Sequence, residues 1–305
     1  MAPKIVIGYD DSAGGEDALA LGLRLSAALG ETPVVATVYP DEHPYGPGRV
    51  DAEWVQVMRE HAEERLARAR EIVGADVAAE YRAVGAESAA HGLDDLAESE
   101  GASMIVVGSS HRCPPRRVLP GSTGDRLLYG AAVPVMVTPR GTRQARDTAA
   151  LHTVGCAFID TPDGHEALAA AAALARRIPG RLRVYTVIAP RSEVLPQWID
   201  AAFVERAREQ ARQALDEALA DLAGGVEASA ELLVGDVVDA LAALDERDVS
   251  LLVCGSRGYG PVRRVLLGGI SARLVRHAAA PVMVVPRSAG DVLRAAGAAT
   301  AAETA

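Results

Sequence analysis

The chain has few aromatic residues, few cysteines and no long apolar run. Aromatic residues make up 4% of its 305 residues, so a core must be built mainly from Ala, Val and Leu. No two of the three cysteines have the spacing of zinc ligands or of a Cys-x-x-Cys motif, so neither a zinc site nor a disulfide framework is predicted. No apolar run reaches the roughly 18 residues of a membrane span, and the first residues have no signal-peptide pattern. We therefore expect a cytoplasmic protein without a membrane partner.

The chain also lacks an excess of positive charge. Its formal net charge is −10, from 31 Lys and Arg against 41 Asp and Glu. Binding to the phosphate backbone of nucleic acid needs a basic face, so no nucleic acid partner is expected. A composition that is 49% hydrophobic and 24% charged is that of a packed globular protein, and 305 residues correspond to about two domains.

What the chain does contain is one pattern that occurs twice, 147 residues apart. Residues 104–111 read MIVVGSSH, and residues 251–258 read LLVCGSRG. The run PVMV also occurs twice, at 134–137 and at 281–284. A constant offset across separated positions indicates two copies of one domain. We predict that copy one covers residues 1–139 and copy two residues 152–287. A linker at 140–151 joins them, and an Ala-rich tail follows at 288–305.

Each copy alternates predicted strands with predicted helices. In copy one the strands are predicted at 4–9, 34–39, 77–83, 104–107 and 133–138, and the helices at 16–29, 51–73, 87–98 and 122–129. In copy two the strands are predicted at 153–157, 183–187, 228–234, 251–254 and 282–285, and the helices at 166–177, 199–222, 237–244 and 271–277. The strands are continuous apolar runs, as in a parallel sheet covered on both faces. This order is typical of a doubly wound α/β domain.

The repeated glycines fall where such a fold binds ligands. Gly108 and Gly255 follow the fourth strand of each copy, and ligands lie beyond the carboxyl ends of the strands in an open α/β sheet. A glycine lets a phosphate approach the backbone. The next helix opens at Gly121, Ser122 and Thr123, and a helix N-terminus attracts anions. Ser122 is the expected N-cap, with a hydroxyl that can also donate to a phosphate oxygen.

Both copies resemble the universal stress protein family in its tandem form, from about residue 4 to residue 287. The family's ATP-binding pattern is Gly-x2-Gly-x9-Gly-Ser/Thr. Copy one reads Gly108-x2-His111-x9-Gly121-Ser122, and copy two reads Gly255-x2-Gly258-x9-Gly268-Gly269. Residues 6–12, VIGYDDS, are similar to the family's first strand and its nucleoside-binding aspartate, which is Asp10 here.

The resemblance implies a fold and a ligand. The fold would be two five-stranded, doubly wound parallel-sheet domains of the adenine nucleotide alpha hydrolase-like kind, with strand order 3-2-1-4-5 and a pseudo-twofold axis. The ligand would be an adenine nucleotide, with ATP, ADP and AMP left open and Mg²⁺ accompanying ATP. The adenosine would lie near Asp10 and Val38 in copy one and near Val187 in copy two. The fifth strands are short apolar edges, so we expect them to pair antiparallel within the chain, as an intrachain pseudo-dimer.

Departures from the family's pattern affect both copies. His111 stands at the second glycine of copy one, and Gly269 replaces the hydroxyl residue of copy two. We assign two extra residues to the first loop of copy two, which sets Asp160 opposite Asp11 rather than Asp10. Copy one is therefore expected to be the better site, with the His111 ring turned toward solvent by a loop that two prolines stiffen.

Several residues have a structural interpretation beside the functional one. Asp10 can belong to a turn before the first helix. The arginine pairs at 116–117 and 263–264 either screen a triphosphate or are solvated. Cys156 and Cys254 end strands that should be neighbours, and they are either a redox pair or two buried thiols.

The predicted function is a stress-response sensor or regulator that binds adenine nucleotide and acts on an unidentified protein partner. The pattern holds no general base and no arginine finger, so at most slow ATP hydrolysis is expected. One alternative is a nucleotide-independent interaction protein with degenerate sites. Another is a flavin-binding or adenylating enzyme, although an aromatic platform and a Ser-Gly-Gly loop are missing. A homodimer of whole chains also stays open.

Overall fold

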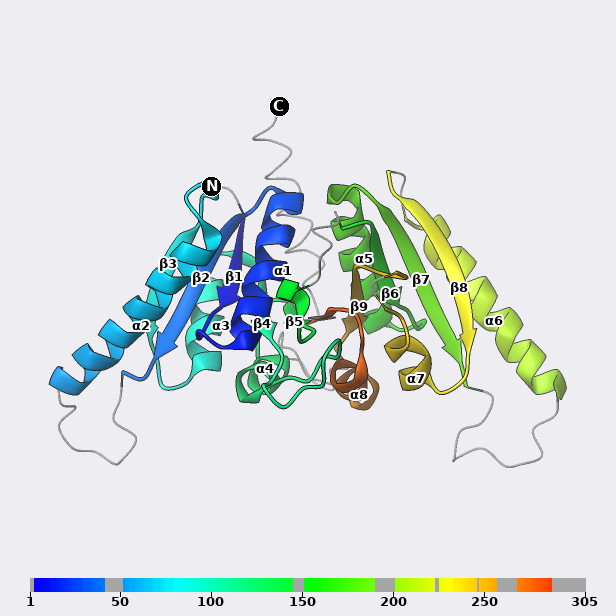
Figure 1. Cartoon of the computed structure of the whole chain (residues 1–305). Helices are drawn as coiled ribbons and strands as arrows, with labels where there is room; N and C mark the ends of the chain where they lie inside the picture. Colours follow the sequence, from blue (N-terminus) through cyan, green and yellow to red (C-terminus); the bar gives the residue numbers. More distant parts are fainter. Residues whose placement is uncertain are drawn as a thin grey trace.

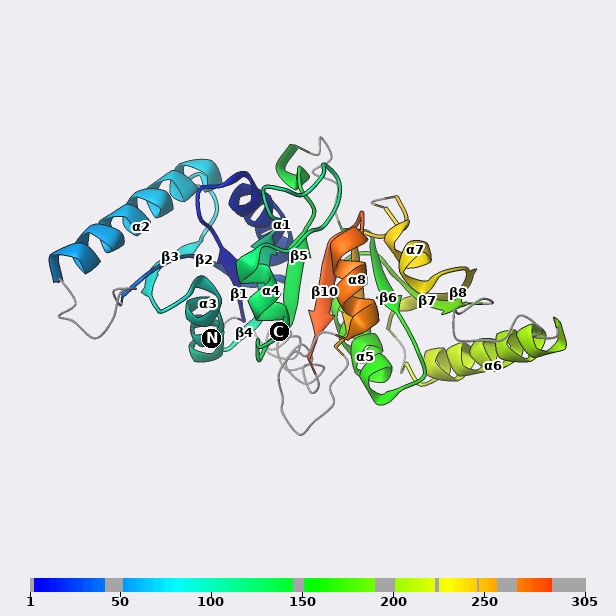
Figure 2. The ribbon, with the colours of Figure 1, turned by 90° about the horizontal axis from the view of Figure 1, so that it is seen from below.

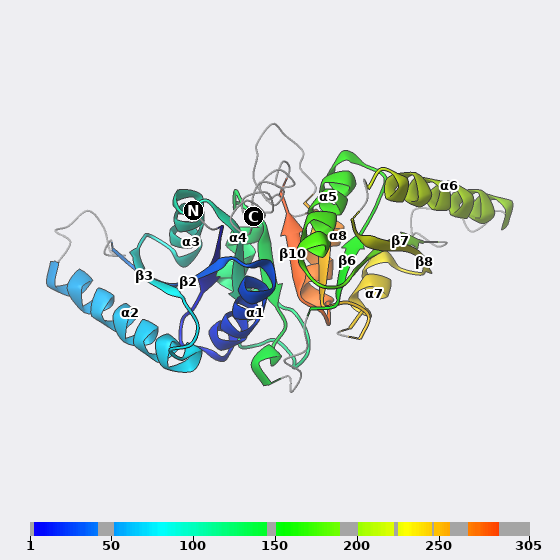
Figure 3. The same cartoon turned by 90° about the horizontal axis from the view of Figure 1, so that it is seen from above.

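The computed structural model describes residues 3–41, 52–144, 151–189, 201–222, 225–245, 247–256 and 268–286. Ten strands of these residues form one sheet, in the order β3-β2-β1-β4-β5-β10-β9-β6-β7-β8. Figure 1 shows two similar halves, with α1 and α5 above the centre of the sheet and α4 and α8 below it. Seen from above, the halves look like half-turn images of one another, with α2 and α6 at the outer ends (Figure 3).

The first half, called domain one, has the predicted strand order 3-2-1-4-5 with parallel pairing throughout. Its elements are β1 (Lys4–Gly8), α1 (Ala13–Leu29), β2 (Thr32–Tyr39), α2 (Ala52–Val73), β3 (Glu80–Gly85), α3 (Ala89–Ser99), β4 (Ala102–Gly108), α4 (Ser122–Leu128) and β5 (Val135–Thr138). A short 3-10 helix, η1 (Thr142–Gln144), opens the linker. β3 begins later than predicted because residues 75–77 form a turn after Gly74, whose φ of 78° suits glycine.

The second half, domain two, repeats the same order of elements. They are β6 (Thr153–Ala157), α5 (Pro162–Arg177), β7 (Arg181–Ile188), α6 (Ala201–Ala220), β8 (Glu227–Val234), α7 (Val237–Ala242), β9 (Leu251–Gly255), α8 (Gly269–His277) and β10 (Val282–Val285). The fold predicted from the sequence is thus confirmed. The Ala-rich tail and most of the linker lie outside the described residues.

Side-chain caps determine where the first helix of each domain begins. The Ser12 hydroxyl accepts a hydrogen bond from the Gly15 amide at 3.1 Å, and Thr161 does the same for the Gly164 amide at 3.2 Å. Gly30 ends α1 in the left-handed conformation, with φ of 64°. α1 therefore starts three residues earlier than its apolar periodicity indicated, because the cap and not the first apolar residue sets the start.

The central strands of the sheet are buried on both faces, which explains their continuous apolar runs, whereas the edge strands β3 and β8 are partly exposed. One core packs α1, α2, α5 and α6 against the sheet, through side chains that include Leu25, Leu66, Leu174 and Leu215. The opposite core packs α3, α4, α7 and α8 against it, through Leu93, Leu127, Leu241 and Leu274. Small Ala side chains fill much of both cores, as the low aromatic content predicted.

The fifth strands of the two domains pair antiparallel, as predicted, and join the halves into one sheet (Figure 2). The register sets Val137 opposite Val282, Met136 opposite Met283 and Val135 opposite Val284. Met136 and Met283 are counterparts in the repeat, and both are fully buried. The pseudo-twofold axis therefore passes through this methionine pair, and neither short apolar edge is left open.

Charged side chains add contacts between the domains on both faces. Arg177 of α5 binds Glu31, with Nη1 at 2.5 Å from Oε1, and donates to the Leu29 carbonyl at 2.6 Å. The Glu31 side chain is fully buried and also accepts a hydrogen bond from Ser103. On the other face, Arg276 of α8 lies 3.1 Å from Asp125 of α4.

The first loop of domain two has the same length as that of domain one, so the two extra residues assigned to it are not there. β1 and β6 start 149 positions apart, and so do α1 and α5. The offset returns to 147 at β4 and β9, so domain two is two residues shorter between its third and fourth strands. Asp160 is the counterpart of Asp11, as expected, and the counterpart of Asp10 is Ile159.

The interpretation of Cys156 and Cys254 as a redox pair is wrong. β6 and β9 are neighbours, but Cys156 lies opposite Val253 and Cys254 opposite Ala157. Successive side chains of a strand point to opposite faces, and the two thiols belong to opposite cores. Burial raises the pKa of Cys156 and raises that of Cys254 to about 12, so both are inert buried thiols.

Gly108 and Gly255 are required by packing, which sequence reasoning did not foresee. A Cβ on Gly108 would lie 1.9 Å from the Gly14 carbonyl oxygen, and one on Gly255 would lie 2.6 Å from the Asp163 carbonyl oxygen. In both domains the end of the fourth strand therefore touches the first turn of the first helix. Gly121 differs, because a Cβ there would meet only Ser110 atoms, at 3.9 Å.

We predict that removing Arg177 destabilises the protein through the buried charge that it leaves. Arg177→Met should lower the free energy of unfolding by about 3 kcal/mol, because the Glu31 carboxylate stays buried without its partner. Arg208→Met is the matched control, since the Arg208–Glu205 pair is exposed and should contribute less than about 1 kcal/mol. Urea denaturation measures both. Adding Glu31→Gln to Arg177→Met should recover part of the loss, and equal losses in the two single variants would contradict the prediction.

We also predict that Gly108 and Gly121 respond differently to an added methyl group. Gly108→Ala should cost about 1–3 kcal/mol of stability, because the methyl group overlaps the Gly14 carbonyl and the start of α1 must move. Gly121→Ala should cost less than about 1 kcal/mol, because its backbone is extended and the space is open, so that only the preference of an N-cap position for Gly over Ala is lost. Thermal unfolding of the two variants distinguishes them. Equal changes would show that Gly108 is not a packing glycine.

Candidate functional site

A cavity of about 340 Å³ lies in domain one at the carboxyl ends of β1 and β4. In a doubly wound sheet this is the point where the connections part to opposite faces, and it is where such folds bind ligands. All the residues predicted for the site of copy one line the cavity: Asp10, Val38, Gly108, His111, Gly121, Ser122 and Thr123. The tertiary structure thus brings together residues from the first, second and fourth strands and from α4.

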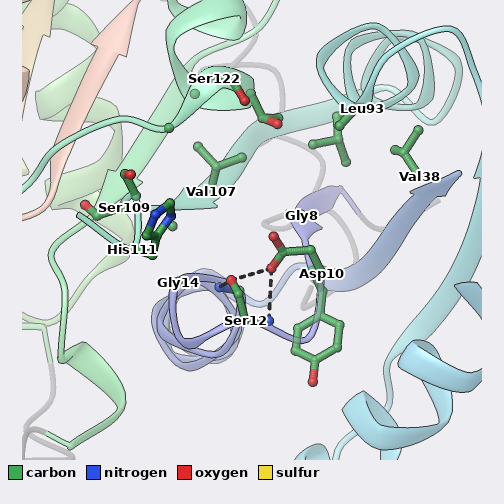
Figure 4. Close-up of a pocket in the computed structure, with 18 of the residues that line it drawn as sticks. Gly8, Asp10, Ser12, Gly14, Val38, Leu93, Val107, Ser109, His111 and Ser122 are labelled. Atoms are coloured by element: carbon green, nitrogen blue, oxygen red, sulfur yellow. Dashed lines mark hydrogen bonds between the residues drawn. The ribbon is translucent and has the colours of Figure 1, made fainter. Parts of the chain in front are cut away.

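The cavity has an apolar wall and a polar wall. Val38 of β2, Leu93 of α3 and Val107 of β4 form the apolar side, and Figure 4 shows their side chains facing the same space. The loop after β1 contributes Asp10 and Ser12 to the polar side. Such a division suits a ligand with one flat apolar end and one polar or charged end.

Asp10 takes part in a turn and also borders the cavity. Its Oδ1 accepts hydrogen bonds from the Ser12 amide at 3.2 Å and from the Ser12 hydroxyl at 2.6 Å. The turn interpretation is therefore correct. It does not displace the carboxylate from the cavity, because Asp10 is exposed and lines it (Figure 4).

Asp11 is held away from the cavity by α2. Its backbone is left-handed, with φ of 63°, and its Oδ2 lies 2.5 Å from Nη2 of Arg68. The hydrogen bond from Arg68 holds the pKa of the Asp11 carboxyl below its usual range. The Tyr9 hydroxyl donates to Asp11 at 3.2 Å, and burial raises the pKa of Tyr9 to about 12. Tyr9 and Arg68 were not predicted from the sequence. The signal for Tyr9 is the difference between the copies, because domain two has Phe158, which lacks the hydroxyl, at the matching position.

The expectation that Ser122 caps α4 is wrong. Gly121 is the N-cap residue, with an extended backbone and no side-chain cap hydrogen bond, and Ser122 is already in the helix. The Ser122 hydroxyl is therefore not used by a cap. Ser122 is exposed and borders the cavity together with Thr123.

His111 lies at the mouth of the cavity. It is exposed, as expected for a ring on the solvent side, yet it borders the cavity beside Ser109 (Figure 4). Arg140 of the linker stabilises the loop that carries His111. It donates to the carbonyls of His111 at 3.1 Å and Cys113 at 2.7 Å. This support was not visible in the sequence.

Arg117 connects the same loop to domain two. Its Nη1 donates to the carbonyls of Ala242 at 3.2 Å and His277 at 2.8 Å, at the ends of α7 and α8. The Val118 amide donates to the Ala278 carbonyl at 2.8 Å. Arg117 is thus an exposed side chain that also makes an interdomain contact, which neither interpretation of the arginine pair foresaw. Arg116 is exposed, and residues 263–264 lie outside the described residues.

The corresponding edge of domain two has lost most of its polar side chains. Ile159 replaces Asp10 and is 53% exposed, while Gly269 and Ile270 replace Ser122 and Thr123. Asp160 pairs with His165 at 2.9 Å. Val187, Gly255 and Gly268 occupy the positions of Val38, Gly108 and Gly121, and Gly258 lies outside the described residues.

The part of the chain that the structure describes has no candidate metal centre and no candidate membrane-spanning helix. Within that part, no group of three or more His, Cys, Asp and Glu side chains is arranged to hold a metal ion. No helix there combines the length and the apolar character needed to cross a membrane.

Comparison with known proteins identifies the family. The model of the universal stress protein family matches residues 1–139 and again residues 151–286. A universal stress protein of Mycobacterium tuberculosis is 31% identical over 293 residues, which cover 92% of this chain and 99% of that protein. The crystal structure of a universal stress protein from Archaeoglobus fulgidus matches with a TM-score of 0.66 at 22% identity, over 93% of this chain and 98% of its own. The duplicated glycine pattern, the sheet order and these matches agree, and the chain belongs to the universal stress protein family.

Proposed function

We propose that domain one binds an adenine nucleotide, with ATP as the first ligand to test, and that the chain is a nucleotide-dependent sensor or regulator in the stress response. One observation carries the proposal. The carboxyl-edge cavity gathers the glycines, hydroxyls and aspartate of the family's nucleotide pattern around one space with an apolar wall. The proposal includes a cytoplasmic location and an unidentified protein partner.

Each wall of the cavity would bind a different part of the nucleotide. Val38, Leu93 and Val107 offer apolar surface to the base, and the Asp10 carboxylate can accept hydrogen bonds from ribose hydroxyls. The hydroxyls of Ser122 and Thr123 can donate to phosphate oxygens. ADP and AMP would use the same residues, and Mg²⁺ would accompany ATP.

Domain two would bind nucleotide weakly or not at all. Ile159 puts an exposed apolar side chain where Asp10 would accept from the ribose, and Gly269 and Ile270 offer no hydroxyl to a phosphate. A site that recognises its ligand through hydrogen bonds loses much of its affinity when one of the hydrogen-bonding groups is missing. Domain two keeps Gly255 for packing, so its glycine pattern does not by itself indicate a second site.

The altered edge of domain two favours a second candidate function. A chain whose sites are both degenerate would act as a nucleotide-independent interaction or scaffold protein. In domain one His111 is the departure that favours this alternative, because it puts a side chain at the mouth of the cavity. Among the described residues that line the cavity there is neither lysine nor arginine, so we propose binding and at most slow hydrolysis.

We predict a stoichiometry of one nucleotide per chain. Gly121→Val should abolish binding, because the added side chain enters the cavity while leaving the packing intact. Gly268→Val is the matched control and should leave binding unchanged. Isothermal titration calorimetry with ATP measures both. If Gly268→Val alone abolishes binding, the ranking of the two domains is reversed, and if the unmodified protein binds no adenine nucleotide the scaffold alternative holds.

We predict that replacing His111 by Gly changes nucleotide affinity by well under tenfold, or less than about 1.4 kcal/mol, because the exposed ring lies at the mouth of the cavity. Equilibrium dialysis with labelled ATP compares the variant with the parent. A large gain in affinity would show that the ring blocks the phosphate position and that domain one is a degenerate site.

A further inference from the structure

The loop that presents Asp10 contains a residue in a rarely used conformation. Asp11 has φ of 63°, a left-handed backbone that Asp tolerates better than most residues. The neighbouring carboxylates of Asp10 and Asp11 have different surroundings. Asp10 borders the cavity and binds Ser12, whereas Asp11 binds Arg68 of α2.

Two groups from separate elements bind Asp11. Arg68 binds one carboxylate oxygen at 2.5 Å, and the Tyr9 hydroxyl donates to the other at 3.2 Å. The Tyr9 carbonyl in turn accepts a hydrogen bond from the buried Thr37 hydroxyl at 2.8 Å. Arg68 does not line the cavity, and its ion pair with the loop after β1 is made to Asp11.

Domain two shows that the fold does not require this arrangement. Its loop has the same length and the same type of cap at Thr161, and Thr186 donates to the Phe158 carbonyl at 3.1 Å, as Thr37 does to Tyr9. Arg68, however, is replaced by Glu217, and Asp160 binds His165. Asp160 is not left-handed.

The domain that has an aspartate at the cavity, Asp10, is also the domain that has this arrangement. Domain one has Asp10, a left-handed Asp11, Arg68 and the Tyr9 hydroxyl, and domain two has none of these four at the matching positions. Caps, loop length and the threonine hydrogen bond are common to both domains. Arg68 and the Tyr9 hydroxyl therefore belong with the site rather than with the fold.

We propose that Arg68 is a positioning residue for the nucleotide site: through its ion pair with Asp11 it holds the loop after β1 in the left-handed conformation that keeps the Asp10 carboxylate at the cavity. This inference rests on the proposed function of domain one. The side chains of Arg68 and Asp11 are 47% and 32% exposed, so their pair adds little to global stability. Its effect should be local to the loop.

The test compares Arg68→Gln with Arg59→Gln, a control on the same helix whose exposed ion pair, with Glu63, lies within α2 and does not involve the loop after β1. Arg68→Gln should weaken ATP binding about threefold to fivefold, the range expected when an exposed ion pair is lost. Arg59→Gln should leave affinity unchanged, and the two variants should have the same melting temperature. Arg68→Lys should restore part of the affinity.

A second readout needs no nucleotide. The Ser12 amide donates to Asp10 Oδ1 at 3.2 Å, so its hydrogen exchange reports whether the loop keeps its conformation. Exchange should be faster in Arg68→Gln than in the parent and unchanged in Arg59→Gln. If exchange in Arg68→Gln equals that of the parent, the inference is overturned, even when the unmodified protein binds no nucleotide and the proposed function itself fails.

Combining Arg68→Gln with Asp11→Asn separates an indirect role from direct contact with the ligand. Asn also tolerates the left-handed conformation, and it removes the charge and one of the two acceptor oxygens while keeping the shape of the side chain. If Arg68 acts through Asp11, the double variant should bind no more weakly than the weaker single variant. Fully additive losses would show that Arg68 acts on the ligand directly, and an unchanged affinity in Arg68→Gln would show that it does not position the site.

Discussion

The antiparallel pairing of β5 with β10 is the interaction on which the rest of the structure depends. Both strands are short and fully buried, and each would be an open apolar edge in a separate domain. Their register through Met136 and Met283 makes one sheet of the two halves and sets the pseudo-twofold axis. The buried Arg177–Glu31 pair and the contacts of Arg117 depend on that placement, because each joins residues of different domains.

Duplication within one chain separates what the fold requires from what the site requires. Gly108 and Gly255 are both excluded from carrying a Cβ by a neighbouring carbonyl, and Ser12 and Thr161 both cap a helix. These features are common to the two domains and serve packing. Asp10, Ser122 and Thr123 occur in domain one and have apolar or glycine counterparts in domain two. A glycine pattern that persists in both halves is therefore weaker support for a ligand than the polar side chains that persist in one.

The loop between Gly108 and Gly121 belongs to the cavity and to the domain interface at once. On one side His111 borders the cavity, and on the other Arg117 donates to the ends of α7 and α8. Arg140 of the linker also binds this loop, by donating to the carbonyls of His111 and Cys113. Beside it, the buried Asp17 of α1 accepts from the amides of Gly141 at 2.8 Å and Arg143 at 2.9 Å. The linker thus begins as an ordered part of domain one.

The sequence by itself determined the duplication and the order of elements, and with the family resemblance it also predicted the pairing of the fifth strands and part of the cavity lining. These depend on local periodicity, on a constant offset and on the rule that parallel strands end at one edge. Only the tertiary structure decided that Gly108 packs against Gly14 and that Ser122 follows the cap of α4. It also decided that Arg68 contacts Asp11 and that Arg117 contacts the helix ends of domain two. Each of these is set by the distance between atoms of segments far apart in the chain or by the exact turn of a loop, and no local pattern of residues encodes either.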